Sequence, residues 1–238
     1  ELMTRLLIVD DHALVAETLG TALSSAELEV ATINPSHEDP ALALSQRVDF
    51  CLLDLDWGHQ VFSGVSLIRG LVDAGAVVLI LTGTMHEPLF GYCLELGAAG
   101  VISKQSSFSE LVDVVQRAIA GEPPNSDGDR YRWIMEAHKA REEHRRRLHP
   151  FDALTQSEGD VLVELLEGHT AAEIAELRTV AISTVRSHIR QILQKLGVNS
   201  QLAAVAMARD AGWPRSQGVV DTESAPDLSS VLPTSRIA

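Results

Sequence analysis

The sequence has few cysteines and no long apolar run. Its two cysteines, Cys51 and Cys93, lie far apart and lack the short paired spacing of metal or redox sites, so we expect two buried, reduced thiols. The longest apolar run, Ala76 to Leu81, is far too short to cross a bilayer. No segment combines a basic start, an apolar stretch and a small-residue cleavage site. These absences predict a cytoplasmic protein with no membrane partner.

Basic residues are also scarce, which at first argues against nucleic acid as a partner. The chain has 19 Lys+Arg against 33 Asp+Glu, a net charge of −14. Residues 1–121 hold 5 basic and 16 acidic residues, whereas residues 122–149 hold 7 and 6, and residues 150–215 hold 6 and 8. Because the distribution of charge decides more than its sum, DNA binding by the second half stays open.

Short β-branched runs alternate with helical patterns over residues 5–120, which is typical of a parallel sheet. We expect strands at Arg5–Val9, Leu28–Ile33, Asp49–Leu53, Val77–Leu81 and Gly100–Ile102. The helices are expected at His12–Ser25, Pro40–Arg47, Val65–Asp73, Glu87–Leu96 and Phe108–Ala120. The pattern predicts a doubly wound α/β domain, (βα)5, over residues 3–121, with its ligand crevice at the carboxyl ends of the strands.

The rest of the chain carries only helical periodicity. Residues 122–149 open with a Pro/Gly-containing stretch and continue as a helix at Tyr131–Leu148, which predicts a linker with a connector helix, either solvated or in a dimer contact. Residues 150–212 predict an all-α, four-helix domain of helix-turn-helix type, with helices at Thr155–Glu167, Ala171–Leu177, Ala181–Leu196 and Ser200–Ala211. Residues 213–238 have no helical or strand periodicity, which predicts a disordered tail.

Three carboxylates are expected at one edge of the sheet. Asp10 and Asp11 directly follow the first strand, and Asp54 follows the third. Such convergence is unfavourable unless a hard cation sits among the carboxylates, and oxygen-only ligands suit Mg²⁺. Thr82 at the end of the fourth strand and Lys104 just past the fifth add a hydroxyl and an ammonium, the groups that bind phosphoryl oxygens. An acidic pair alone would indicate only a solvated loop.

The receiver-domain pattern of two-component response regulators is matched, in order and position, by Asp10, Asp11, Asp54, Thr82 and Lys104. This resemblance covers residues 5–120. It implies that Asp54 is the nucleophile that accepts a phosphoryl group from a sensor histidine kinase. It also implies that Asp11, Asp54 and the backbone carbonyl of Asp56 ligate Mg²⁺, that Asp10 acts through water, and that Thr82 and Lys104 move toward the phosphate.

Two features depart from the receiver pattern. Val101 stands three residues before Lys104, where receivers usually carry an aromatic side chain, so rotation of a switch aromatic cannot report phosphorylation. The loop from Asp54 to Gly64 lacks the usual proline and is longer than is typical of the family. His12 and His59 border the pocket, and we interpret both as surface histidines rather than metal ligands or phosphodonors.

A helix that starts near Ile182 has two distinct faces. One face is apolar and is expected to be buried through Val185, Ile189, Ile192, Leu193 and Leu196. The other presents Arg186, Ser187, Arg190 and Gln194. Arginine on such a face can meet phosphates or guanine edges in a major groove, which admits one helix. A single arginine would indicate no more than a solvated surface.

Residues 150–212 are similar to the LuxR-type, or NarL/FixJ, output domain, for example at Thr155, Glu158, Thr184-Val185, His188 and Lys195-Leu196-Gly197. The resemblance implies contact with double-stranded DNA by Thr184, Arg186, Ser187, Arg190 and Lys195. The sequence departs from the pattern where Leu177 and Arg178 look exchanged, where Ala181 replaces a Ser/Thr cap and where Gln201 replaces an arginine. Because the domain is weakly acidic, a monomer should bind weakly, so dimerisation or the basic connector must help, and we expect a homodimer.

These observations favour a DNA-binding transcriptional response regulator, activated by phosphoryl transfer to Asp54 with Mg²⁺, and not an enzyme. A second hypothesis is a regulator of the same architecture that a ligand or protein partner controls, which Val101 and the long loop favour and the intact pocket disfavours. A third is a phosphatase that uses the acidic pocket. The third is disfavoured because no second carboxylate is spaced for acid–base work and a DNA-reading domain follows.

Overall fold

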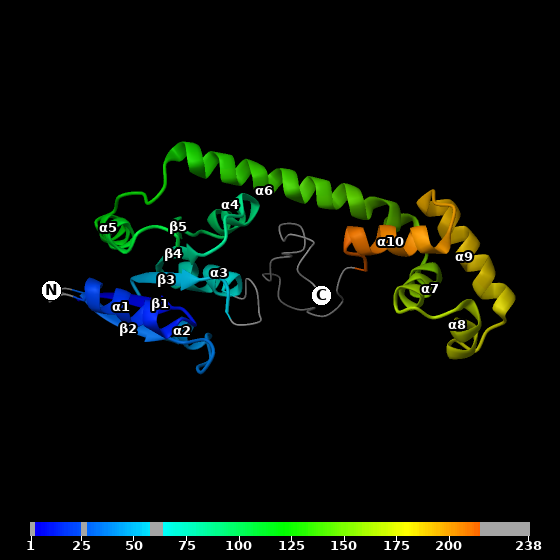
Figure 1. The fold of residues 1–238 in the computed structure, drawn as a ribbon, viewed down its shortest axis with the longest axis horizontal. Coiled ribbons are helices and arrows are strands. Elements are labelled where there is room, and N and C mark those ends of the chain that lie inside the picture. Colours follow the sequence, from blue (N-terminus) through cyan, green and yellow to red (C-terminus); the bar gives the residue numbers. More distant parts are fainter. Residues whose placement is uncertain (1–2, 25–27, 58–63, 215–238) are drawn as a thin grey trace. The chain divides into compact units, whose positions relative to one another are not determined.

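The computed structural model describes residues 3–24, 28–57 and 64–214 (Figure 1). The chain divides into two compact units, residues 1–138 and a second unit from Lys139 onward, and each is treated by itself below. Among the described residues, no helix is both long enough and apolar enough to cross a membrane.

The first unit contains a five-stranded parallel sheet in the order β2-β1-β3-β4-β5. Its strands are β1 (Thr4–Val9), β2 (Leu28–Ile33), β3 (Phe50–Asp54), β4 (Val77–Thr82) and β5 (Gly100–Ser103). Each lies within one residue of its predicted ends, so the predicted (βα)5 sheet is confirmed. The strand order places β1 and β3 side by side at the centre, which brings the residues that follow them to one edge.

Helices cover both faces of the sheet. They are α1 (Ala13–Leu23), α2 (Leu42–Ser45), α3 (Val65–Asp73), α4 (Glu87–Glu95) and α5 (Phe108–Ile119). One apolar cluster joins α1 and α5 to alternate strand residues such as Leu6, Leu52 and Leu79. The strand residues between them are also buried, as expected for a parallel sheet enclosed on both faces. Helix α2 is shorter than the predicted Pro40–Arg47.

Helix α6 (Asp127–Leu148) begins earlier than predicted. The predicted helix started at Tyr131 because Gly128 looked like part of a linker. Instead Ser126 caps the helix start, where its Oγ accepts a hydrogen bond from the backbone N of Asp129 at 3.1 Å. The first compact unit extends to His138, within α6, and the domain boundaries expected at residues 121 and 149 stay predictions.

The second unit is helical throughout its described part. After a 3-10 turn (His149–Ala153) come α7 (Gln156–Leu166), α8 (Ala171–Leu177), α9 (Ile182–Leu196) and α10 (Gln201–Ala211), which confirms the predicted four-helix domain. Thr155 and Thr170 form capping boxes at α7 and α8, and Ser200 caps α10. Trp213, placed in the tail by the sequence, stacks on Phe151 at 5.3 Å between ring centroids. Residues 215–238 lie outside the described part.

Candidate functional site

The acidic residues meet at the carboxyl edge of the sheet, as the sequence predicted. Asp10 follows β1 and Asp54 ends β3, and each is only 1% exposed. Ligand atoms of Asp10, Asp11, His12 and Asp54 all lie within 4.8 Å of one another. The adjacency of β1 and β3 in the sheet is what brings these carboxylates together from positions far apart in the sequence.

Lys104 lies between two of the carboxylates. Its Nζ is 2.8 Å from Asp10 Oδ2 and 2.8 Å from Asp54 Oδ2. Burial by itself would lower the pKa of Lys104, but the contacts with Asp10 and Asp54 outweigh it and raise that pKa above its ordinary value. The lysine is therefore charged, and it holds the end of β5 against the pocket.

Asp54 is a buried carboxyl group with a raised pKa. Burial raises its pKa to about 6, an effect that the hydrogen bond and charge of Lys104 oppose and the charge of Asp10 reinforces. The backbone N of Asp56 donates to Asp54 Oδ1 at 3.4 Å. At neutral pH the Asp54 carboxyl group is mostly ionised, so it can act as a nucleophile.

The Thr82 hydroxyl is engaged in the turn between β4 and α4. Thr82 is fully buried, and its Oγ1 accepts a hydrogen bond from the backbone N of Thr84 at 3.2 Å and lies 3.1 Å from Thr84 Oγ1. The backbone N of Lys104 donates to the carbonyl O of Thr82 at 2.8 Å. The predicted pair, Thr82 and Lys104, is thus joined through the backbone, while the hydroxyl points to its own turn.

His12 borders the pocket, as the sequence predicted. Its side chain is 66% exposed, yet Nδ1 lies 2.8 Å from Asp11 Oδ1 and 3.2 Å from Asp10 Oδ1. Its position next to Asp11 in the sequence was the available signal. His59 and most of the long loop after Asp56 fall within residues 58–63, outside the described part.

The donor set of the pocket fits a hard divalent cation. Asp10, Asp11 and Asp54 supply three carboxylates, and one lysine ammonium balances only part of their charge. Because oxygen donors of this kind suit Mg²⁺ better than a soft metal, the cluster is typical of a magnesium site.

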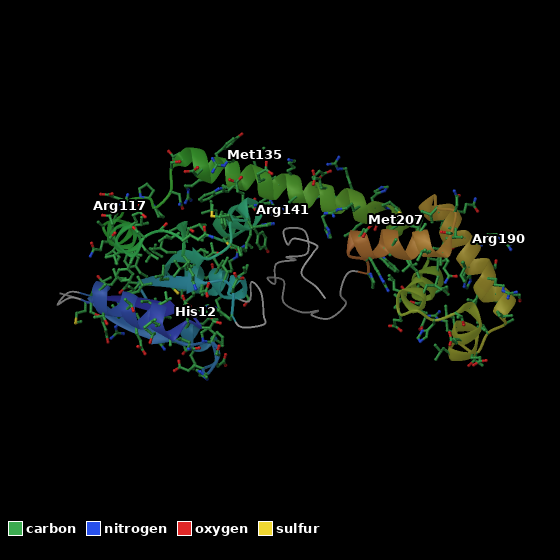
Figure 2. The ribbon with its side chains drawn as sticks, in the orientation of Figure 1. His12, Arg117, Met135, Arg141, Arg190 and Met207 are labelled. Atoms are coloured by element: carbon green, nitrogen blue, oxygen red, sulfur yellow. The ribbon has the colours of Figure 1, made fainter. Side chains whose placement is uncertain are left out.

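Helix α9 has the two faces that its periodicity predicted. Val185, Ile192 and Leu196 are buried in the core of the second unit, and Ile189 and Leu193 pack against it. Thr184, Arg186, Ser187, Arg190 and Gln194 are exposed. Figure 2 shows the labelled Arg190 on α9. This face offers two guanidinium groups and two hydroxyl groups to a ligand.

Lys195 differs from the other residues predicted to bind DNA. Its Nζ lies 2.6 Å from Oε2 of Glu158, a carboxylate only 3% exposed. The same oxygen accepts hydrogen bonds from the backbone N and the hydroxyl of Thr155, at 2.6 Å and 2.9 Å. The ammonium group is therefore already committed within the domain.

Comparison with known proteins agrees with both halves of the chain. The model of the response regulator receiver domain matches residues 6–116, and that of bacterial regulatory proteins of the luxR family matches residues 152–208. The chain is 28% identical over 206 residues to the nitrate/nitrite response regulator protein NarP of Escherichia coli K12, covering 85% of this chain and 93% of that protein. The chain is a DNA-binding response regulator of the NarL/FixJ family.

Two further proteins are similar to this chain over most of its length. The transcriptional regulatory protein LiaR of Bacillus subtilis 168 is 28% identical over 210 residues, which is 87% of this chain and 97% of LiaR. The crystal structure of the response regulator ChrA is 26% identical, with a TM-score of 0.40, covering 87% of this chain and 97% of that chain. Both matching family models are those of regulatory proteins, and LiaR is a transcriptional regulatory protein, so the family gives no support to a phosphatase.

The response regulator keeps the departures that its sequence showed. Leu177 is 61% exposed, and Arg178 forms an ion pair with Asp160 at 2.9 Å; the exchange of the two residues relative to the family stays a prediction. Ala181 begins α9 without a side-chain cap. Cys51 and Cys93 are free and buried, and burial raises the pKa of each thiol to about 12.

Proposed function

We propose that this response regulator accepts a phosphoryl group on Asp54 from a sensor histidine kinase and that the modification controls DNA binding by α9. The observation that carries the proposal is the meeting of the ionised Asp54 carboxylate with Lys104 and two further aspartates at one edge of the sheet. A carboxylate beside a fixed ammonium can attack phosphorus while the charge that develops on the phosphoryl oxygens is balanced.

In the transfer, an Asp54 oxygen forms the new bond to phosphorus as the bond from phosphorus to the kinase histidine nitrogen breaks. The leaving nitrogen keeps the electron pair. Lys104 then contacts a phosphoryl oxygen in place of a carboxylate oxygen. The Thr82 hydroxyl can leave Thr84 and contact a second phosphoryl oxygen. Mg²⁺ would be held by Asp11, Asp54 and the Asp56 carbonyl, with Asp10 acting through water, and it would neutralise the phosphoryl oxygens.

The proposed DNA surface is the exposed face of α9. Arg186 and Arg190 would contact base edges or phosphates, Ser187 would donate a hydrogen bond, and Thr184 near the helix start would meet a backbone phosphate. Lys195 would add little, since its ammonium is paired with Glu158. A weakly acidic domain gains affinity by pairing, which supports a homodimer on two half-sites about one helical turn apart.

The alternative is control by a ligand or a protein partner instead of phosphate. One experiment separates the two: the full chain is incubated with acetyl phosphate and Mg²⁺, and its intact mass is measured. A gain of one phosphoryl group, lost in excess chelator, supports phosphorylation. An unchanged mass under conditions that label a control receiver would favour the alternative.

The DNA surface is tested by selecting bound sequences from genomic DNA and measuring mobility shifts. Arg186→Ala or Arg190→Ala should each cost about 1–3 kcal/mol of binding free energy where the arginine reads a base. Arg117→Ala, an exposed arginine of α5, is the matched control and should change nothing. Binding that never prefers any sequence over random DNA would contradict the proposed surface.

A further inference from the structure

The outer edge of β5 is covered by the chain that follows α5. β5 is the last strand of the sheet, and on its outer side no strand of the described residues pairs with its backbone groups. The backbone N of Val101 donates to Asn125 Oδ1, and Asn125 Nδ2 donates to the carbonyl O of Val101, both at 2.8 Å. The guanidinium of Arg130 donates to the Ala99 carbonyl. One asparagine amide thus replaces a neighbouring strand.

The start of α6 continues this cover over α4. Six consecutive residues of α4, Leu89 to Leu94, are buried, which indicates a helix enclosed on all sides. Trp133 packs edge-on against Phe90, with ring centroids 5.2 Å apart. Glu87, at the start of α4, is ion-paired with Arg132 at 3.0 Å. We call residues 124–138 the cover segment; it lies within the first unit.

The fit between α4 and the cover segment leaves no room at Gly91. A Cβ atom added to Gly91 would overlap the backbone carbonyl of Trp133 and would lie 2.9 Å from the Ala137 Cβ. Backbone atoms cannot move aside as a flexible side chain can. A displacement of α4 toward α6 must therefore push the cover segment away.

Both elements that hold the cover segment meet the acidic pocket: β5 ends there, and the turn that leads into α4 begins there. Lys104 directly follows β5 and contacts Asp54. Thr84, which holds the Thr82 hydroxyl, lies in the turn that leads into α4, and His86 caps that helix by accepting a hydrogen bond from the backbone N of Leu89 at 3.2 Å. A change in the partners of Lys104 or Thr82 therefore acts directly on β5 and α4.

We propose that the cover segment senses the state of the pocket and that phosphorylation of Asp54 loosens it from β5 and α4. The inference rests on the proposed phosphorylation. When Lys104 and Thr82 turn to phosphoryl oxygens, the end of β5 and the β4–α4 turn shift, and the close fit at Gly91 is lost. Helix α6 runs on to Leu148, which is buried in the core of the second unit, so the loosened helix also belongs to the DNA-binding domain. This chain has no aromatic side chain at position 101 to report phosphorylation, and the backbone of Val101 takes that role.

The first test measures hydrogen exchange of the Val101 amide in the full-length protein, with and without beryllofluoride and Mg²⁺. Fluorine NMR of bound beryllofluoride reports pocket occupancy independently. We expect exchange at least about fivefold faster when the pocket is occupied, because the amide loses its Asn125 partner more often. Unchanged or slower exchange in an occupied pocket would overturn the cover-segment proposal alone. A pocket that never binds beryllofluoride would overturn the phosphorylation proposal and this one together.

The second test uses Gly91→Ala, which should detach the cover segment without phosphate. Without beryllofluoride, the Val101 amide of Gly91→Ala should exchange as fast as that of the wild type with beryllofluoride bound. The DNA affinity of Gly91→Ala should equal that of the phosphorylated wild type. Gly20→Ala is the matched control, since its Cβ would meet Val30 at an ordinary 3.6 Å. Asn125→Ala removes only the two bonds to Val101 and should give the same changes, even if Gly91→Ala fails to fold. The proposal would be overturned if Asn125→Ala had the amide exchange and the DNA affinity of the wild type, whether or not Gly91→Ala folds.

Discussion

Each unit of the molecule contains a lysine whose ammonium contacts a buried carboxylate, but the two sites differ in how far the negative charge of their carboxylates is balanced. In the first unit, Lys104 is shared between Asp10 and Asp54, and Asp11 adds a further carboxylate. In the second unit, Glu158 is satisfied by Lys195 and by both the backbone and hydroxyl of Thr155. The first site keeps an excess of negative charge, whereas the second is closed.

This difference separates a switch from a structural contact. An incomplete cluster can gain a cation or a phosphoryl group, and its lysine has alternative partners to choose from. A complete cluster gains nothing from a ligand, and its loss leaves a buried carboxylate without compensation. The same chemical pair therefore predicts opposite responses to mutation, metal and pH.

The largest expected effect is the loss of phosphorylation in Asp54→Asn. An amide oxygen is too weak a nucleophile to attack phosphorus, and no other carboxylate ends β3, so acetyl phosphate should add no mass to this variant. Asp113→Asn, an exposed carboxylate of α5, should be labelled like the wild type. Full labelling of Asp54→Asn would place the phosphoacceptor elsewhere.

Magnesium should stabilise only the first unit. With the metal at about 100 times its dissociation constant, we expect a gain of about 2.7 kcal/mol in the free energy of unfolding of that unit, because the metal relieves repulsion among the carboxylates. Amide exchange, measured domain by domain, would show the gain. Asp11→Asn should reduce the gain, and equal stabilisation of the second unit would contradict the comparison.

Lys195→Ala should destabilise the second unit by about 1–3 kcal/mol, a range reduced from that of a fully buried pair because the lysine side chain is one-third exposed. Urea unfolding measures this loss. Arg190→Ala on the same helix is exposed and should change the free energy of unfolding by less than about 0.5 kcal/mol. A stable Lys195→Ala variant that binds DNA poorly would instead favour a phosphate contact.

The closed pair should also show in the pH dependence of stability. Burial tends to raise the pKa of Glu158, but Lys195 and Thr155 outweigh it and hold the pKa below its ordinary value. Because the folded-state pKa is depressed, the stabilisation is complete above the pKa of the unfolded state and is lost as the pH falls through the folded-state pKa. Urea unfolding from about pH 6 to about pH 3 should show this loss in the wild type and a smaller one in Lys195→Ala.

The smallest expected effect comes from completing the caps of the second unit. Helices α7, α8 and α10 each begin with a side-chain cap, whereas α9 begins at Ala181 without one. Ala181→Ser should raise the free energy of unfolding by about 0.5–1 kcal/mol. Thr170→Ala should lower it by a similar amount, and no change in either variant would mean that caps contribute little here.

Local patterns in the sequence determined the strands, most helix ends, the acidic pocket and the two faces of α9. Alternation along a strand, the helical period and the position of Asp10 or Asp54 just at a strand end are all properties of neighbouring residues. These patterns can be recognised without knowledge of the rest of the chain. The start of α6 was misjudged because Gly128 weakens the helical pattern that Ser126 then caps.

Only the tertiary structure decided which distant residues become partners. Lys195 finds Glu158 across 37 positions, and Asn125 finds the Val101 backbone across 24. Neither pairing has a periodic signal, since each depends on how separate elements pack. A sequence shows that a lysine is charged and lies on an exposed helix face, but whether that charge meets DNA or a buried carboxylate is set by the element that packs beside it, because only burial makes the pairing necessary.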